Sequence, residues 1–333
     1  MDDLAIIFIY TNKCPLTDIN YQSIQKYSDG AKVYAIHQND FANNFYDFLD
    51  YRHISQWSGR DVWYWGSDNI FLYWFLSNPD KRAKQYLILE YDCYVTNSIK
   101  ETLHIDNNVI QNHDGIISAN TIFASNHEES YWWFEAQRYQ PLIDKHYGWN
   151  NFVACSPLCG TMISDNAVHR VVEECKKIPL VNKIYVETKF ATILKYLDFQ
   201  VDSFDTGDVK IEKYITYDAR DCLSHIIDLA QKQESLKGIF HPIKDIRILE
   251  RYFMNKIKKQ DINHALFGQL NDVTSSLNFL KQHTDLKHFV VDNSLFGDPS
   301  PGFPKRLYLT YKKNGQIYNK IINEDEMLVL EGL

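Results

Sequence analysis

One short run of apolar residues constrains the fold of this chain more than any other feature. Residues 4–10, LAIIFIY, are apolar at every position and rich in β-branched side chains. A strand with one side in water alternates polar and apolar residues, whereas a strand covered on both sides does not. The run therefore predicts a strand buried on both faces, as in the sheet of an α/β domain. Residues 86–89, YLIL, predict a second buried strand.

Further segments continue the alternation of strands and helices expected of an α/β sheet. We expect strands over residues 32–37, 115–119 and 199–204, and helices over residues 17–28, 68–76, 166–176, 187–197 and 218–236. Residues 154–163 predict a loop and a strand. The fold class is thus α/β, with a mixed Rossmann-type sheet flanked by helices.

The character of the sequence changes near residue 261. Short apolar segments replace the long ones, and Asn314-Gly315 predicts a tight hairpin turn between residues 308–312 and 316–322. We expect two domains, an α/β domain over residues 1–255 and a small β-rich accessory module over residues 261–333. The basic stretch 256–259 is the candidate linker.

Composition excludes several classes of protein. Forty-three acidic residues against 35 basic ones give a net charge of −8, which disfavours binding to nucleic acid. No apolar run is long enough to span a membrane, and Asp2 and Asp3 are unlike a secretory signal. The six cysteines are too sparse for a disulfide scaffold, so we expect reduced, buried thiols and a cytoplasmic protein. Lys256, Lys258 and Lys259 are either a solvated face, which we favour, or a peripheral contact with the inner face of a membrane.

Aromatic residues make up 14% of the chain and cluster over residues 57–74 and 131–149. Flat rings with polar edges stack on sugars, but they also fill large cores. Composition alone favours the core.

The acidic pair Glu90 and Asp92 directly follows the strand of residues 86–89. Side chains two positions apart on an extended chain point the same way, so the two carboxylates converge. Hard oxygen ligands suit Mg²⁺ or Mn²⁺ together with the phosphates of a nucleotide. Far along the chain, His241 and Lys244 flank Pro242. They are candidates for a metal ligand and a phosphate contact, and the alternative is a surface turn.

Two further positions have both a functional and a structural interpretation. Gly160 permits a close backbone approach to a ligand, or forms a tight turn. Glu187 begins a predicted helix, where it is either a capping group or a general base. The sequence contains no P-loop, GxGxxG, HExxH or GxSxG motif, which argues against the corresponding enzyme classes.

The order of these segments resembles the GT-A glycosyltransferases, which use nucleotide-diphosphate sugars. The segment LILEYDCYV, residues 87–95, is similar to their D-x-D metal motif, with Glu90 in place of the first Asp. Residues 65–69, the CGTM segment at 159–162 and IFHPIK at 239–244 resemble the donor, acceptor and C-terminal histidine segments. Residues 186–199 resemble the region that carries the acid near the acceptor, although Asp198 replaces the usual Gly. The resemblance covers about residues 1–250.

The resemblance implies a hexosyltransferase-like enzyme of polysaccharide biosynthesis. It would transfer a sugar from a UDP- or GDP-type donor to a hydroxyl of a glycan or lipid-linked glycan. It also implies the following roles: Glu90, Asp92 and His241 as ligands of Mg²⁺ or Mn²⁺; Thr11, Asp40, Asp68 and Lys244 as donor contacts; Gly160, Trp132 and Trp133 as acceptor contacts; and Glu187 as the general base.

Three alternatives stay open. The same acidic pair would serve a nucleotidyl- or phosphotransferase, and the aromatic residues would serve a non-catalytic carbohydrate-binding protein. The third alternative is an assembly factor that works through its C-terminal module. That module resembles a small β-rich module of varied multidomain proteins, in residues 265–268, 272–274 and 296–302 and in Lys305.

Overall fold

The computed structural model describes residues 2–10, 15–37, 59–123, 131–156, 158–204, 215, 219–253, 262–267, 271–283, 287–296, 305–331 and 333. Within it the chain divides into two compact units. The first comprises residues 1–11, 23–222 and 237–242, and the second comprises residues 12–22, 223–236 and 243–333. The domain limits at 255 and 261 stay a prediction, and the candidate linker lies outside the described residues.

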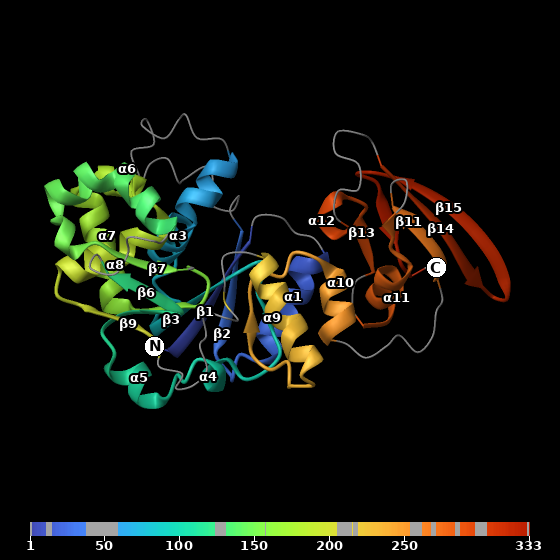
Figure 1. Cartoon of the computed structure of the whole chain (residues 1–333), viewed down its shortest axis with the longest axis horizontal. Helices are drawn as coiled ribbons and strands as arrows, with labels where there is room; N and C mark the ends of the chain where they lie inside the picture. Colours follow the sequence, from blue (N-terminus) through green and yellow to red (C-terminus); the bar gives the residue numbers. More distant parts are fainter. Residues whose placement is uncertain are drawn as a thin grey trace. The chain divides into compact units, whose positions relative to one another are not determined.

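The strands include those that the apolar runs predict (Figure 1). They are β1 (Asp2–Tyr10), β2 (Lys32–His37), β3 (Ala83–Glu90), β4 (Tyr94–Val95), β5 (Gly115–Ser118), β6 (Asn120–Phe123), β7 (Val153–Ser156), β8 (Thr161–Ser164), β9 (Gln200–Ser203), β10 (Ile239–Phe240), β11 (Ile262–Phe267), β12 (Asn271–Asp272), β13 (His288–Val290), β14 (Arg306–Lys313), β15 (Gln316–Asn323) and β16 (Met327–Val329).

Helices separate most of these strands. They are α1 (Pro15–Lys26), α3 (Gly59–Ser77), α4 (Ile99–Thr102), α5 (Asn107–Asn112), α6 (Tyr131–His146), α7 (Asp165–Lys177), α8 (Val186–Tyr196), α9 (Ala219–Gln231), α10 (Ile246–Ile248), α11 (Thr274–His283) and α12 (Asn293–Phe296). Short 3₁₀ turns cover Trp149–Asn151 and Pro179–Lys183, and a π-helical turn covers Leu249–Phe253. No helix among the described residues is both long enough and apolar enough to cross a membrane.

The first unit is built on a six-stranded mixed sheet in the order β2-β1-β3-β8-β5-β9. Strand β1 runs parallel to both β2 and β3, so these three strands end at the same edge of the sheet. Strand β8 runs antiparallel to β3 and β5 and begins at that edge, because Thr161 is aligned with Ile88. The sheet therefore places residues after β1, β2 and β3 beside residues before β8. The expected α/β fold with a mixed sheet is confirmed.

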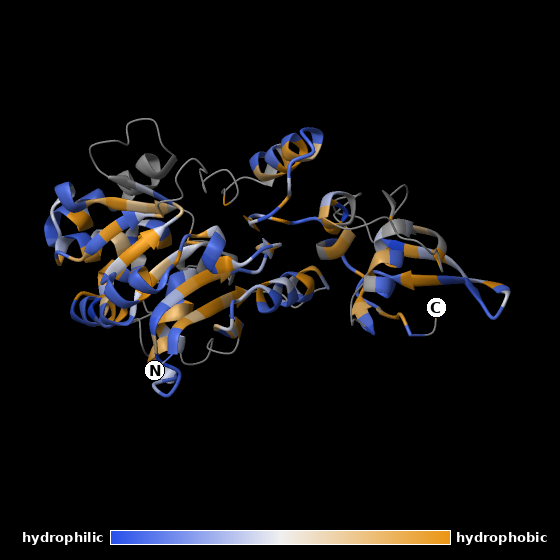
Figure 2. Cartoon of the chain, turned by 90° about the horizontal axis from the view of Figure 1, so that it is seen from below, coloured by the Kyte–Doolittle hydropathy of each residue, from blue (hydrophilic) through white to orange (hydrophobic). Residues whose placement is uncertain are grey.

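Both faces of the central strands are covered, as the continuous apolar runs predict. Residues 4–9 of β1 are all buried, and its alternate residues Ala5, Ile7 and Ile9 belong to the largest core cluster. Helices α3, α7 and α8 supply the other side of that cluster. Figure 2 shows the hydrophobic colour running along the strands of this unit. Many aromatic residues fill this core, among them Phe71, Trp74, Phe75, Tyr86 and Phe190.

The β-rich part of the second unit contains a four-stranded antiparallel sheet in the order β12-β11-β14-β15. The predicted hairpin turn is confirmed, because β14 and β15 are joined by Asn314 and Gly315. Both turn residues have positive φ angles, 51° and 83°. This is the conformation that an Asn-Gly hairpin turn adopts. Residues 274–283 form helix α11, in a stretch where the sequence indicated a short apolar segment and no helix was predicted.

Candidate metal centre

The centre begins where strand β3 ends. Glu90 is the last residue of β3, and the chain turns directly after it, with the Cys93 N–H donating to the Glu90 carbonyl at 3.0 Å. The turn carries Asp92, which is buried. The continuous apolar run that makes β3 a central strand thus delivers two carboxylates to the strand-end edge of the sheet.

A two-residue strand pair brings His241 to the same place. Strand β4 follows Asp92 after one residue and pairs antiparallel with β10, with Tyr94 opposite Phe240. Hydrogen bonds between Thr96 and Gly238 extend this pair. The Gly238 carbonyl accepts from the Thr96 N–H (2.9 Å) and from Thr96 Oγ1 (3.3 Å), and the Gly238 N–H donates to Thr96 Oγ1 (3.0 Å). His241 follows β10 immediately. About 150 residues of sequence separation are therefore closed by a few backbone hydrogen bonds.

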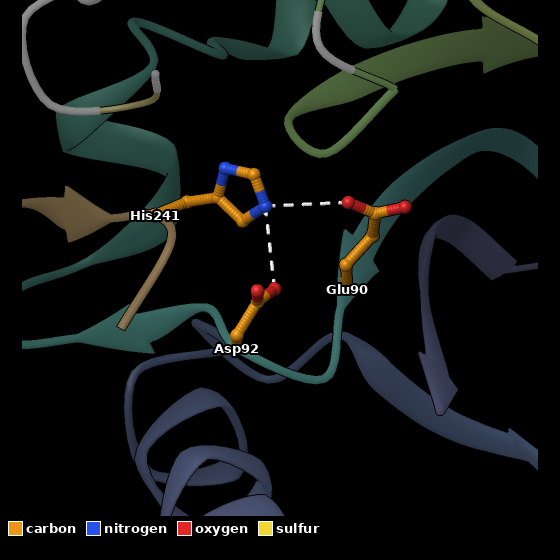
Figure 3. Close-up of side chains that lie close together, drawn as sticks. All are labelled: Glu90, Asp92 and His241. Carbon is orange, nitrogen blue, oxygen red and sulfur yellow. Dashed lines mark ion pairs between the residues drawn. The ribbon is translucent and has the colours of Figure 1, made fainter. Parts of the chain in front are cut away.

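The three side chains converge on one point (Figure 3). His241 Nε2 lies 3.2 Å from Glu90 Oε2 and 3.3 Å from Asp92 Oδ1. His241 and Asp92 are buried, and Glu90 is partly exposed. One ligand atom from each of the three residues lies within 4.8 Å of the others, a spacing that a single cation can bridge. The structure thus brings together the three residues that the sequence assigned to a metal.

The charges of this group are unbalanced, and the donor set therefore fits a cation. One imidazole nitrogen faces two carboxylates, and its single N–H cannot compensate both. Burial disfavours the charged imidazole, but Cys159 and the carboxylates of Asp92 and Glu90 raise the pKa of His241 well above its usual value. Two carboxylates and one imidazole suit a divalent ion such as Mn²⁺ or Mg²⁺.

Three buried thiols lie behind the imidazole. The Cys159 thiol is hydrogen-bonded to that of Cys93, and the backbone N–H of His241 donates a hydrogen bond to the sulfur of Cys222. Burial raises the pKa of Cys159 well above its ordinary value and that of Cys222 to about 12. These thiols contribute packing around the centre, and the expectation of buried thiols is confirmed for Cys93, Cys155, Cys159, Cys175 and Cys222.

Glu187 lies in the first turn of α8 and is buried. Its Oε1 accepts a hydrogen bond from the N–H of Leu158 at 3.3 Å. Leu158 belongs to the segment before β8, which the Gly160 N–H ties to the Ile88 carbonyl of β3 at 2.8 Å. Burial, and then the negative charge of Glu90, raise the pKa of Glu187 well above its usual value. The carboxyl therefore stands close enough to the metal centre to sense its charge.

Asp68 has a different environment from the one expected of a donor contact. It is fully buried in α3, and its Oδ2 lies 2.5 Å from Nζ of Lys189 in α8, which is equally buried. Lys189 also donates to Asn69 Oδ1 at 2.8 Å. Burial raises the pKa of Asp68, and the ammonium group of Lys189 opposes that rise. In the structure Asp68 joins two helices, and its contact with a donor stays a prediction.

Gly160 likewise has a packing explanation. It has a φ of 78°, and an added Cβ would lie 2.7 Å from Ile215 Cδ1. Ile215 in turn forms a β-bridge with His241. A side chain at position 160 would therefore disturb the residue that supports the histidine, whereas contact of Gly160 with an acceptor stays a prediction.

The remaining assignments stay predictions. Thr11 and Asp40 lie outside the described residues, as do the side chains of Trp132 and Trp133, whose backbone belongs to α6. Lys244 is exposed and belongs to the second unit. Two other aromatic residues of the 131–149 cluster contribute to the core, the role that composition favours: Tyr147 is buried, and Trp149 stacks on Phe152 at 4.8 Å.

Sequence reasoning missed Lys189 and Cys222. Lysine is almost never fully buried, so a lone Lys within an amphipathic helix is normally expected to be exposed. The clue was its place beside apolar residues in KFATIL, residues 189–194. Cys222 gave no clue, because its role depends on the backbone of His241.

Comparison with known proteins adds structural likeness without sequence likeness. No family model matches the chain, and no curated protein matches it. A solved structure that resembles it is the apo form of mouse xyloside xylosyltransferase 1, with 12% sequence identity and a TM-score of 0.36. The match covers 72% of this chain and 97% of the mouse chain. At that TM-score the two chains share too little geometry for the likeness to assign a function.

Proposed function

We propose that this chain is a metal-assisted glycosyltransferase that takes its sugar from a nucleotide-diphosphate donor. The observation that carries the proposal is the convergence of Glu90, Asp92 and His241 at the strand-end edge of a mixed α/β sheet. Support comes from the order of the sequence motifs, in which an acidic pair follows a central strand and a histidine segment returns to it. The acceptor is a hydroxyl of a glycan or of a lipid-linked glycan.

The three residues have distinct tasks in this proposal. Asp92 and Glu90 supply the anionic ligands, and His241 supplies a neutral nitrogen once it has lost its proton. A bound Mg²⁺ or Mn²⁺ would stabilise the charge that develops on the departing diphosphate. The β4–β10 pair and the hydrogen bond from the backbone N–H of His241 to the Cys222 sulfur position the backbone that carries the imidazole.

Glu187 is the proposed general base, and its environment sets a condition on that role. Because burial and then the charge of Glu90 raise its pKa, the carboxyl gives up its proton less readily than an exposed glutamate does. It becomes a base when the charge of Glu90 is compensated. The hydrogen bond from Leu158 orients the carboxylate in that state.

Binding and turnover of donors test the proposal. Thermal unfolding is followed with UDP, GDP and a panel of UDP- and GDP-sugars, each with Mn²⁺ or with EDTA. We expect one donor class to raise the melting temperature in the presence of Mn²⁺, because a ligand of the folded state stabilises it. Incubation of that donor with glycan acceptors should release the nucleoside diphosphate.

A matched pair of variants locates the effect. Asp92→Asn should abolish the Mn²⁺-dependent shift, whereas Asp3→Asn should retain it, because Asp3 is an exposed carboxylate at the opposite end of β1. Release of inorganic diphosphate would support the nucleotidyltransferase alternative instead. Glycan binding that is insensitive to EDTA, without donor turnover, would support the carbohydrate-binding alternative. Either result would refute the glycosyltransferase.

A further inference from the structure

In the hairpin of β14 and β15, strand β15 lies at the edge of the sheet. Strand β15 stands last in the order β12-β11-β14-β15 and pairs with β14 on one side. Among the residues that the structure describes, no strand pairs with its other side. Such an edge presents a row of N–H and C=O groups that are ready to pair with another strand. The strand is eight residues long and contains no proline.

The outer face of this hairpin carries three exposed apolar side chains among polar ones. Ile317 is 65% exposed and Ile321 is 58% exposed, and Tyr308 of β14, also exposed, lies directly across from Ile321. The opposite face already packs against the rest of the unit, because its residues Leu307, Leu309 and Ile322 are buried. Burial of two large aliphatic side chains against a partner removes apolar surface from water, which favours association.

The hairpin turn fixes which backbone groups face the open edge. In a two-residue hairpin the residues that flank the turn, here Lys313 and Gln316, form a hydrogen-bonded pair. Hydrogen-bonded and non-hydrogen-bonded pairs then alternate along the ladder. The N–H and C=O groups of residues 317, 319 and 321 therefore point away from β14, toward the open edge.

We propose that β15 pairs antiparallel with β15 of a second copy of this chain, about a two-fold axis at Asn319. This inference concerns the second unit and does not depend on the proposed enzymatic function. In this register Asn319 faces its own equivalent, and Ile317 faces Ile321 of the second copy on both sides of the axis. All residues that direct backbone groups to the open edge then meet residues of the same kind.

Neighbouring registers are worse. A shift of the axis to Tyr318 or Lys320 would keep the hydrogen-bonding pattern, but it would place Asn319 opposite Ile317 or Ile321, so that the aliphatic pairs would be lost. The shift to Lys320 would also place two ammonium groups opposite each other, and Lys320 is the single charged residue in the strand. In the proposed register Lys320 faces the ring of Tyr318 of the second copy, a favourable cation–aromatic contact.

The side chain at the axis is held in place. The Thr310 hydroxyl donates to Asn319 Oδ1 at 2.8 Å, which fixes the amide on the outer face of the hairpin. The apolar residues Tyr308, Ile321 and Ile317 of the second copy then form one stripe across the junction. The strand is thus complementary to itself in hydrogen bonding and in apolar surface and opposes no like charges in this register, and this is the reason for choosing a second copy as the partner.

Analytical ultracentrifugation of the full chain over a range of concentrations tests the proposal. We expect reversible dimerisation. Ile321→Lys should raise the dissociation constant at least about tenfold, because each dimer loses two apolar pairs and gains two edge charges. Met327→Lys is the matched control, since Met327 is similarly exposed but lies on β16, outside this sheet. Its dissociation constant should not change, and circular dichroism should show both variants folded.

Cross-linking tests the register independently of affinity. Asn319→Cys should form an intermolecular disulfide under mild oxidation, because a directly opposed pair has Cα atoms about 5.5 Å apart. Ile317→Cys should not, since equivalent residues at this position lie about four residues apart along the strands. The proposal is overturned if the chain is monomeric at all concentrations, if both lysine variants weaken the dimer equally, or if both cysteine variants cross-link alike.

Discussion

The first unit contains two groups in which acidic and basic side chains meet in the interior. In one group the charges are equal in number, and in the other they are not. Asp68 and Lys189 form a closed pair in which one carboxylate meets one ammonium group, both without exposure to solvent. Glu90, Asp92 and His241 place two carboxylates against one imidazole. The charges of Asp68 and Lys189 balance, and this pair joins α3 to α8. The group of Glu90, Asp92 and His241 has an excess of carboxylates and can therefore bind a cation. Charge balance, rather than burial, therefore separates a structural ion pair from a candidate metal centre.

Removal of one partner from each group should give the sharpest contrast. Lys189→Met leaves the carboxylate of Asp68 buried without its ammonium partner, so we expect a loss of about 3–5 kcal/mol in unfolding free energy. Asp92→Asn in EDTA should change it by about 1 kcal/mol or less, because Glu90 still faces His241. Urea unfolding monitored by tryptophan fluorescence measures both.

A double variant shows whether the first loss comes from the unpaired charge. Asp68→Leu combined with Lys189→Met should recover most of the stability, since an apolar pair replaces a buried ion pair without large cost. Equal losses for Lys189→Met and Asp92→Asn would show that the two groups are both structural, and the contrast between them would be lost.

Manganese should act on one of the two groups. At a concentration about 100 times its dissociation constant, Mn²⁺ should stabilise the wild-type chain by about 2.7 kcal/mol, because it binds the folded state. Asp92→Asn should lose this stabilisation. Asp68→Asn, if it folds, should retain it despite its lower starting stability. Urea titrations with and without Mn²⁺ give these differences, and stabilisation that survives in Asp92→Asn would place the ion elsewhere.

The pH dependence of metal binding should sharpen the contrast further. The surrounding negative groups raise the pKa of His241, so a proton must leave before the imidazole can bind a metal. The affinity for Mn²⁺ should therefore rise with pH, by up to about tenfold per pH unit below the pKa of His241. Without metal the sign reverses: the charged imidazole stabilises the fold below its unfolded pKa of 6.5, and this contribution is lost as pH rises through the folded value.

Calorimetric titrations at several pH values measure this linkage. His241→Gln should bind Mn²⁺ more weakly and with little dependence on pH in the same range. If the wild-type affinity were independent of pH, the imidazole would not be a ligand, and the metal would be held by the two carboxylates alone.

The sequence predicted this contrast in part. The apolar run before Glu90 and Asp92 located the carboxylates, because a buried strand must end where its polar residues begin. The sequence also singled out His241, but it did not show what brings this residue to the carboxylates. Strands β4 and β10, which do so, are two residues long and carry no recognisable periodicity. Asp68 was assigned as a donor contact because residues 65–69 resemble the donor segment of the GT-A glycosyltransferases. The sequence did not indicate that Asp68 pairs with Lys189, 121 positions away, because the burial of Lys189 depends on how α8 packs.

Glu187 provides the smallest and most specific test. Burial and the charge of Glu90 raise its pKa in the folded chain, so the native state binds a proton that the unfolded state releases above pH 4.5. Stability should therefore fall as pH rises from 4.5 toward the folded pKa. Glu187→Gln keeps the acceptor for the Leu158 N–H but carries no titratable group, so its advantage over the wild type should grow with pH in this window.

Glu173→Gln is the control, because Glu173 is an exposed acid on α7 and should show no such trend. The test also reports on the metal centre, since Glu187 responds to the charge of Glu90. Saturating Mn²⁺ should compensate that charge, lower the pKa of Glu187 and narrow the pH-dependent gap between wild type and Glu187→Gln. A gap that Mn²⁺ leaves unchanged would mean that burial alone sets the protonation of Glu187, and the uncompensated centre would then have no electrostatic influence on its proposed base.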